Sequence, residues 1–332
     1  AFAGHCGLDI NLQSLSNDAM RVLFNEELGC VIQISEKDNA DVLKTLAHYG
    51  LNHISHSIGS ITKELVVKVN HGSGTWLQRN LMALREIWSE TTYQMQALRD
   101  NPQCALEEKQ HRLDSQNPGI NPQLTFDPAE DIAEQYLNLT DKPKVAILRE
   151  QGVNSHLEMA AAFLKAGFNA VDVHMSDLLA DRVQLDGFVG LVACGGFSYG
   201  DVLGAGEGWA KSILFNDKLK KQFKTFFEQE NTFALGICNG CQMLSNLRSL
   251  IPGTEQWPHF VRNTSEQFEA RFSMVEVADS PSIFLQGMAG SKIPVVVSNA
   301  EGRAEYDTEN NAKLANESGL VVARFIDNYG QV

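Results

Sequence analysis

A cysteine flanked by two glycines is the feature of this chain that most clearly points to chemistry. Cys238 has Gly236 two residues before it and Gly240 two residues after it, where the apolar run 232–235 gives way to helical spacing at 242–247. Because glycines permit a tight, strained strand-to-helix turn, this pattern is typical of a nucleophile elbow at the carboxyl edge of a sheet. The N-terminus of the following helix favours the thiolate. The sequence therefore predicts chemistry at a cysteine nucleophile.

A second glycine-rich site, Gly195-Gly196, directly follows the apolar run 189–193. Paired glycines at the end of a strand let the backbone approach a ligand closely and turn an N–H group toward it. An acyl-transfer enzyme needs such donors where the tetrahedral oxyanion develops. A Gly-Gly pair alone is also typical of a plain turn, but its place in the same predicted sheet as Cys238 favours the functional interpretation.

Cys238 and Cys241 also form a Cys-x-x-Cys motif, which in an α/β chain is compatible with a redox pair. A zinc site is disfavoured, because no second pair of cysteines or histidines lies at ligand spacing. We therefore predict no metal site. Since the glycines flank Cys238 and not Cys241, the second cysteine is interpreted as a small helix residue packed inward.

A cysteine that attacks an amide normally needs a histidine base, itself oriented by a carboxylate. His156 and Glu158 form the only His-x-Glu pattern, and we interpret them as residues of a helix entry. His174 ends a predicted strand, His259 lies in a predicted loop, and neither has an evident carboxylate partner in the sequence. The motifs thus supply a nucleophile and an oxyanion loop but no base.

Composition and charge limit the classes of partner. The 332 residues, 43% hydrophobic and 20% charged, are typical of a globular protein with room for two domains. A net charge of −14 argues against nucleic acid and anionic membranes as partners, because both bind basic patches. No apolar stretch is long enough to span a bilayer. The six scattered cysteines fit a reducing compartment, so we expect a cytoplasmic protein.

The elements that must position the two glycine-rich sites follow an alternating pattern from residue 142 onward. Short apolar strands are predicted at 145–148, 170–173, 189–193 and 233–237, with helices such as 155–166 between them. This order predicts an α/β fold with a doubly wound, mostly parallel sheet that binds ligands at the carboxyl ends of its strands. Three further strands are predicted at 272–277, 294–297 and 320–326.

The first part of the chain is predicted to form a smaller α+β lobe over residues 1–113. Its strands are predicted at 29–34, 53–58 and 64–69, and its helices at 37–49 and 75–98. Residues 114–141 carry Asn-Pro steps and little periodicity, so we interpret them as a linker with a short helix at 127–137.

Three motifs together give the chain a specific resemblance. They are AILREQGVNSH at 146–156, GGFSYGDVL at 195–203 and GICNGCQ at 236–242. Over essentially its whole length the chain resembles the large single-chain phosphoribosylformylglycinamidine synthases. The resemblance implies that residues 142–332 are a flavodoxin-like class I glutamine amidotransferase domain. Residues 1–113 are similar to the C-terminal domain of aminoimidazole ribonucleotide synthetase.

The resemblance also implies residue roles. Cys238 would attack the side-chain amide of glutamine, the backbone N–H groups of Gly196 and Asn239 would form the oxyanion hole, and Gln242 and Gly195 would bind the substrate. Ammonia would pass to the synthetase portion of the parent polypeptide, which converts formylglycinamide ribonucleotide to the amidine in purine biosynthesis. ATP and Mg²⁺ belong to that portion, and we expect this segment to bind neither.

Two departures from the family pattern stand out. The family's catalytic His-Pro-Glu motif is absent, so we expect a domain truncated before that motif and nearly inactive alone. Relatives commonly carry His-Gly where this chain has Asn299-Ala300, in a loop that we expect to face the synthetase portion.

Three hypotheses therefore stay open. The leading one is a glutaminase segment of an ATP-dependent amidotransferase. The second is a non-catalytic scaffold, which the missing base would favour. The third is a redox protein that uses Cys238 and Cys241, and it predicts a reversible disulfide.

Overall fold

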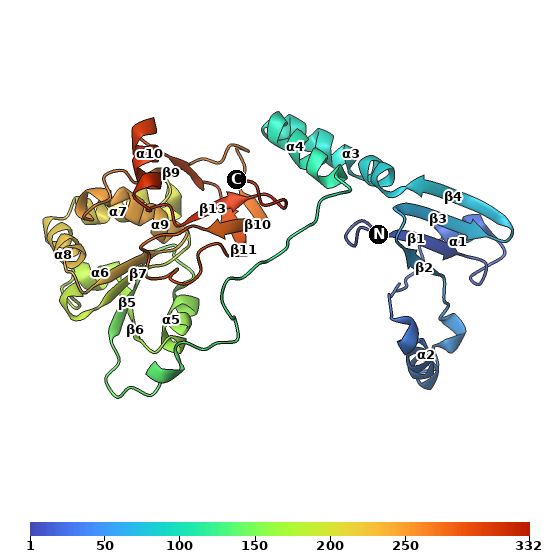
Figure 1. Cartoon of the computed structure of the whole chain (residues 1–332), viewed down its shortest axis with the longest axis horizontal. Coiled ribbons are helices and arrows are strands. Elements are labelled where there is room, and N and C mark those ends of the chain that lie inside the picture. The colour runs from blue at the N-terminus through green and yellow to red at the C-terminus, as the bar shows by residue number, and fades with distance from the viewer. The chain divides into compact units, whose positions relative to one another are not determined.

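The computed structural model describes residues 1–332, which form two compact units, Ala1–Asn117 and Pro118–Val332 (Figure 1). The helices and strands of the first unit are β1 (Gly7–Asn11), α1 (Ala19–Phe24), α2 (Asn39–His48), β2 (Gly59–Thr62), β3 (Val66–His71), β4 (Gly74–Asn80), α3 (Leu81–Arg99) and α4 (Pro102–Leu113).

The first unit contains a four-stranded sheet in the order β2-β1-β3-β4. The central strand β1 pairs parallel with β3 and antiparallel with β2, and β3 and β4 form a hairpin. The side chain of Asn80 caps α3 by accepting the N–H groups of Met82 and Ala83. Asn101 caps α4 in the same way, and Pro102 is its first residue, where no N–H is needed.

Several elements predicted for this unit are wrong. Residues 29–35 have no regular secondary structure, with Val31 84% exposed, and the predicted strand 53–58 is replaced by a single 3₁₀ turn and extended chain. The helix predicted over 75–98 begins at Leu81, because the residues before it form β4. An apolar run becomes a strand only where a neighbouring strand supplies hydrogen bonds and burial, and local pattern does not reveal that neighbour.

The second unit holds a larger α/β layer structure. Its first part comprises β5 (Lys144–Arg149), α5 (His156–Lys165), β6 (Asn169–His174), α6 (Met175–Leu179), β7 (Gly190–Ala193), α7 (Glu207–Leu214), α8 (Asp217–Phe227), β8 (Phe233–Gly236) and α9 (Asn239–Asn246). Its second part comprises β9 (His259–Val261), β10 (Glu269–Val277), β11 (Lys292–Asn299), β12 (Arg303–Glu305), α10 (Glu309–Glu317) and β13 (Ala323–Ile326).

Four strands form a wholly parallel sheet in the order β6-β5-β7-β8. Numbered along the chain this order is 2-1-3-4, the flavodoxin-like arrangement, in which ligands bind outside the carboxyl ends of the strands. The predicted α/β class with a doubly wound sheet is therefore confirmed.

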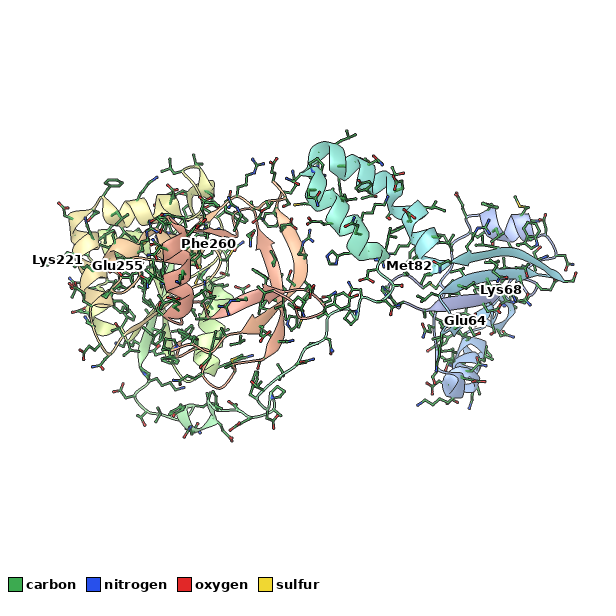
Figure 2. All side chains as sticks on the ribbon, turned by 45° about the horizontal axis from the view of Figure 1, so that its top comes forward. Glu64, Lys68, Met82, Lys221, Glu255 and Phe260 are labelled. Atoms are coloured by element: carbon green, nitrogen blue, oxygen red, sulfur yellow. The ribbon has the colours of Figure 1, made fainter.

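Helices cover both faces of this sheet. One core cluster joins α6, α7, α8 and α9 to one face, with Trp209 and Phe223 fully buried, and a second joins α5 to the other face through Phe163 (Figure 1). Lys221 on the outer side of α8 points to solvent (Figure 2). The central strands β5 and β7 are buried on both faces, which explains their short, uninterrupted apolar sequences.

The strands predicted after residue 271 form a separate antiparallel sheet in the order β11-β10-β13, and β9 pairs with β12. Part of the segment before β5 joins this sheet. Gln123 forms an isolated antiparallel bridge with Lys292, and the hydroxyls of Thr125 and Ser291 lie 2.7 Å apart.

Candidate active site

The turn between β8 and α9 has the geometry of a nucleophile elbow. Cys238, between the two elements, has φ 52° and ψ −115°, a conformation that L-residues rarely adopt, and its side chain is exposed. A Cβ added at Gly240 would lie 2.0 Å from the carbonyl oxygen of Ala193, and one at Gly236 would lie 2.7 Å from the Gly240 oxygen. Only glycine therefore fits on either side of the cysteine.

The Gly-Gly loop lies directly beside this elbow, because β7 and β8 are neighbours in the sheet. A Cβ added at Gly195 would lie 3.1 Å from the Cβ of Cys238. Gly196 has φ 143°, and a Cβ there would lie 2.4 Å from the carbonyl oxygen of Gly152. The fold thus places the backbone of the Gly-Gly loop close to Cys238.

The loop is held by the segment that follows β5. The N–H of Asn154 donates to the oxygen of Gly195 at 3.2 Å, and the N–H of Phe197 donates to the oxygen of Gly152 at 2.9 Å. Between these two bonds Gly196 faces Val153 without bonding to it, so its own N–H points away from that segment.

Two backbone donors near the thiol are left without an acceptor in the chain. One is the N–H of Gly196, and the other is the N–H of Asn239, in the first turn of α9, where helices leave N–H groups unpaired. These are the two groups predicted to form the oxyanion hole. Sequence reasoning missed Ser155, whose hydroxyl accepts the Gly195 N–H at 2.9 Å and lies 3.2 Å from the Gly195 oxygen.

The side chains of Asn239 and Gln242 lie behind the elbow. The fully buried Asn239 carboxamide donates to the Gln242 side-chain oxygen at 3.1 Å, and the Gln242 amide nitrogen donates to the Glu301 carbonyl at 2.6 Å. Gln242, predicted to bind glutamine, thus has protein partners at both ends of its amide.

The turn at 298–302, where this chain departs from its relatives, reaches the elbow. The carbonyl oxygen of Ser298 lies 4.0 Å from the sulfur of Cys238, and Asn263 pins the turn by bonding to Asn299 and Gly302. The side-chain oxygen of Asn299 is buried without a partner. This turn therefore contributes backbone to the surroundings of the Cys238 thiol.

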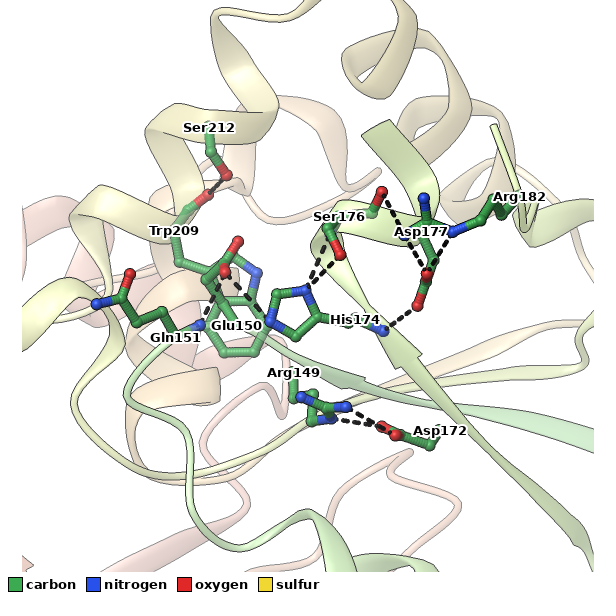
Figure 3. A network of polar contacts seen from close by, with 10 residues as sticks. All are labelled: Arg149, Glu150, Gln151, Asp172, His174, Ser176, Asp177, Arg182, Trp209 and Ser212. Carbon is green, nitrogen blue, oxygen red and sulfur yellow. Dashed lines mark hydrogen bonds and ion pairs between the residues drawn. The ribbon is translucent and has the colours of Figure 1, made fainter. Parts of the chain in front are cut away.

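Both histidines that lacked a partner in the sequence have one in the fold. The Nε2 atom of His174 lies 3.6 Å from the buried carboxylate of Glu150 (Figure 3). Because His174 Nδ1 accepts the N–H of Ser176 at 3.1 Å, the neutral ring carries its proton on Nε2, facing Glu150. His259 lies in β9 and not in a loop, and its Nε2 is 3.9 Å from Asp307.

Neither pair is placed to serve Cys238. His174 ends β6, three strands from β8, which at about 4.8 Å per strand is about 14 Å away. His259 follows Pro258, whose carbonyl accepts the hydroxyl of Ser245 near the end of α9, roughly 10 Å along the helix from the nucleophile. The interpretation of His156 as a helix-entry residue is confirmed, since α5 begins there.

The two other cysteines near the parallel sheet, Cys241 and Cys194, are less exposed than Cys238. Burial raises the pKa of the Cys241 thiol to about 11, with the neighbouring Cys238 as a smaller cause. Burial likewise raises the pKa of Cys194 to about 12. No group of three or more His, Cys, Asp or Glu side chains is placed to hold a metal ion, and no helix is long and apolar enough to cross a membrane.

The parallel sheet and its elbow define an α/β protein that presents an exposed cysteine thiol beside backbone N–H groups without an acceptor in the chain. The chain belongs to the family of CobB/CobQ-like glutamine amidotransferase domains, whose model matches residues 142–332.

Two solved structures are similar to parts of the chain. One is the structure of PurLQS from Thermotoga maritima, with 22% identity and a TM-score of 0.44 over 56% of this chain and 76% of that one. The other is a putative GMP synthase component from Thermoplasma acidophilum, with 20% identity and a TM-score of 0.32 over 51% of this chain and 69% of that one. Family membership rests on the match to residues 142–332.

Proposed function

We propose that residues 142–332 cleave the side-chain amide of glutamine through Cys238. The sulfur attacks the amide carbon, and the carbonyl oxygen takes up the negative charge between the N–H groups of Gly196 and Asn239. The C–N bond then breaks, ammonia leaves after gaining a proton, and a γ-glutamyl thioester remains. Water hydrolyses the thioester to glutamate and the free thiol. The proposal is carried by one observation, the exposed thiol of Cys238 beside two unpaired backbone donors.

We propose further that residues 1–332 alone turn over glutamine slowly. Deprotonating the thiol and protonating the departing ammonia both need a base, and the two histidine–carboxylate pairs of this chain lie about 10 Å or more from the sulfur. The base of the full reaction would then come from residues outside these 332.

A reagent with a better leaving group tests acylation without that base. γ-Glutamyl p-nitroanilide should acylate Cys238 in a burst of one equivalent of p-nitroaniline, because this weakly basic amine needs little protonation to leave. Mass spectrometry should locate a γ-glutamyl group on the peptide that contains Cys238. Cys241→Ala is the matched control, and it should retain the burst.

An absent burst would contradict the proposal and favour a scaffold. A reversible disulfide between Cys238 and Cys241, lost together with all acylation in the Cys241→Ala variant, would favour the redox hypothesis instead.

We propose as the finer function that the segment supplies ammonia to an ATP- and Mg²⁺-dependent synthetase portion that makes formylglycinamidine ribonucleotide. The three motifs at 146–156, 195–203 and 236–242 support this, and residues 1–113 would then be the end of the synthetase portion. In the full-length parent, Cys238→Ala should abolish amidine formation from glutamine and leave formation from ammonium salts intact. Loss of both activities would contradict the division of labour.

A further inference from the structure

The loop that follows the Gly-Gly pair is strained. Tyr199, Gly200 and Asp201 are three consecutive residues with positive φ, at 53°, 63° and 51°. For the two that are not glycine this conformation costs about 1–2 kcal/mol each, so the surrounding structure must hold it in place. The contacts that hold this loop therefore fix the position of the residues beside it.

The loop closes around one side chain, the carboxamide of Asn239. The oxygen of that carboxamide accepts the N–H of Ser198 at 3.0 Å. Its nitrogen donates to the carboxylate of Asp201 at 2.9 Å. Asn239 is fully buried, so both bonds lie away from water. One residue of α9 is thus bound by the two ends of the strained turn.

Asp201 also connects this contact to a second helix. The carboxylate oxygen that accepts from Asn239 also accepts the N–H of Gly206, the N-cap of α7, at 3.2 Å. A carboxylate at a helix N-terminus is electrostatically favourable. Gly206 in turn packs tightly on α9, since a Cβ there would lie 2.5 Å from the backbone nitrogen of Met243. Asp201 therefore joins the glycine loop, the start of α7 and the start of α9.

On its other side the same loop is anchored to β5. The N–H of Tyr199 donates to the oxygen of Gln151 at 3.0 Å. The Tyr199 hydroxyl faces the buried Glu150 carboxylate, and burial together with that carboxylate raises the pKa of Tyr199 to about 12. Contacts with Glu150 and Gln151 thus hold one side of the loop against the segment after β5. The Asn239–Asp201 contact holds its other side against the start of α9.

We propose that Asp201 is a positioning residue that sets the separation between the two oxyanion donors, the N–H groups of Gly196 and Asn239. These donors belong to loops that follow different strands, and their spacing must match the oxyanion closely for both to bond to it. Asn239 carries one donor on its backbone, and its carboxamide binds the loop that carries the other. The inference rests on the proposed glutaminase function, which it deepens.

The test compares two reactions of the same thiol in the full 332-residue chain. Acylation by γ-glutamyl p-nitroanilide develops an oxyanion, whereas alkylation by iodoacetamide displaces iodide at a tetrahedral carbon and develops none. Both rates are measured across pH, so that any change in thiolate fraction cancels in their ratio.

Asp201→Ala should slow acylation by about tenfold to a hundredfold, less than the roughly 10²–10³-fold cost of removing an oxyanion donor, because the donor is displaced and not lost. Its alkylation rate should stay within about twofold of the unmodified chain. Asp201→Asn should recover most of the acylation rate, since its amide oxygen can accept the same two N–H groups.

Asp201→Glu is a second variant that keeps the charge and moves the carboxylate by one methylene. This variant tests the inference if Asp201→Ala does not fold. It should also slow acylation while leaving the alkylation rate unchanged. Equal loss of both reactions in Asp201→Glu, or unchanged acylation in a folded Asp201→Ala, would overturn the inference. If the unmodified chain alkylates but never acylates, the proposed function itself fails.

Discussion

The carboxyl edge of the parallel sheet carries two clusters of reactive side chains that differ in how they are paired. At the β7–β8 end, Cys238 is exposed beside unpaired backbone N–H groups. At the β5–β6 end, one carboxylate oxygen of Glu150 lies 3.6 Å from His174 and also accepts the Gln151 N–H, and the other ring nitrogen of His174 contacts Ser176 (Figure 3). The first cluster is open to a ligand, and the second is closed on itself.

Residue type alone therefore does not mark a catalytic group. A histidine beside a buried carboxylate has the composition of an acid–base pair, yet β5 and β7 separate it from the nucleophile. The β7–β8 end differs in its backbone. Cys238 has a strained positive φ there, and the N–H groups of Gly196 and Asn239 have no acceptor in the chain. Strain of this kind persists only where the surrounding structure holds it.

The strongest effect should separate the two clusters directly. Cys238→Ala should abolish acylation by γ-glutamyl p-nitroanilide, a loss of about 10³-fold or more, because the attacking atom is gone. His174→Gln should change the burst rate by less than about twofold. Stopped-flow absorbance of p-nitroaniline measures both, and a large loss in His174→Gln would contradict the separation of the clusters.

The next prediction concerns the backbone of the open cluster. Gly196→Ala places a Cβ 2.4 Å from the Gly152 oxygen at φ 143°, so the loop must move and its N–H with it. We expect the acylation rate to fall by about 10²-fold.

Gly253→Ala is the matched control, because Gly253 also has a positive φ, 77°, but no atom lies near the added Cβ. It should cost about 1 kcal/mol of stability and leave the acylation rate unchanged. An equal rate loss in both variants would show that general destabilisation is the cause.

A smaller effect should appear in the pH dependence of stability. Burial and Glu150 raise the pKa of Tyr199 to about 12, above its ordinary value of 10.0, so folding favours the neutral phenol. This contribution is complete below about pH 10 and is lost as the pH rises toward 12. In urea unfolding, the stability of the unmodified chain should therefore fall more steeply over that window than that of Tyr199→Phe. Parallel curves would contradict the shift.

The weakest effect is expected at the ion pair of Arg149 and Asp172, which joins β5 to β6 beside the closed cluster. Arg149 donates two hydrogen bonds to Asp172, at 2.7 and 2.9 Å, and holds the pKa of that carboxyl below its ordinary value. The pair stabilises the fold above the ordinary carboxyl pKa and is lost as the pH falls below it. Asp172→Asn should cost less than about 1 kcal/mol at neutral pH, measured by urea unfolding, and a loss of several kcal/mol would contradict this ranking.

Predictions were correct where a feature depends on residues close together in the sequence, and wrong where it depends on residues far apart. The elbow at Cys238 was predictable, because the apolar strand, the two glycines and the helical spacing that form it are adjacent in the sequence. The four parallel strands were predictable because each has a short, largely apolar sequence, which for the central strands β5 and β7 reflects burial on both faces. The strand predicted at 29–34 failed, since its apolar residues have no neighbouring strand to pair with.

The order of residues along the chain was enough to predict the glycine-flanked turn at Cys238, the glycine pair and the α/β class, because each depends on neighbouring residues or on their period. The folded chain was needed to find that the turn at 298–302 reaches the thiol, that Glu150 pairs with His174, and that Asp201 binds Asn239. These contacts join residues that are far apart in the chain, and they depend on strand order and loop path. Hydrophobic periodicity records which face of an element is buried, and not which element lies against it.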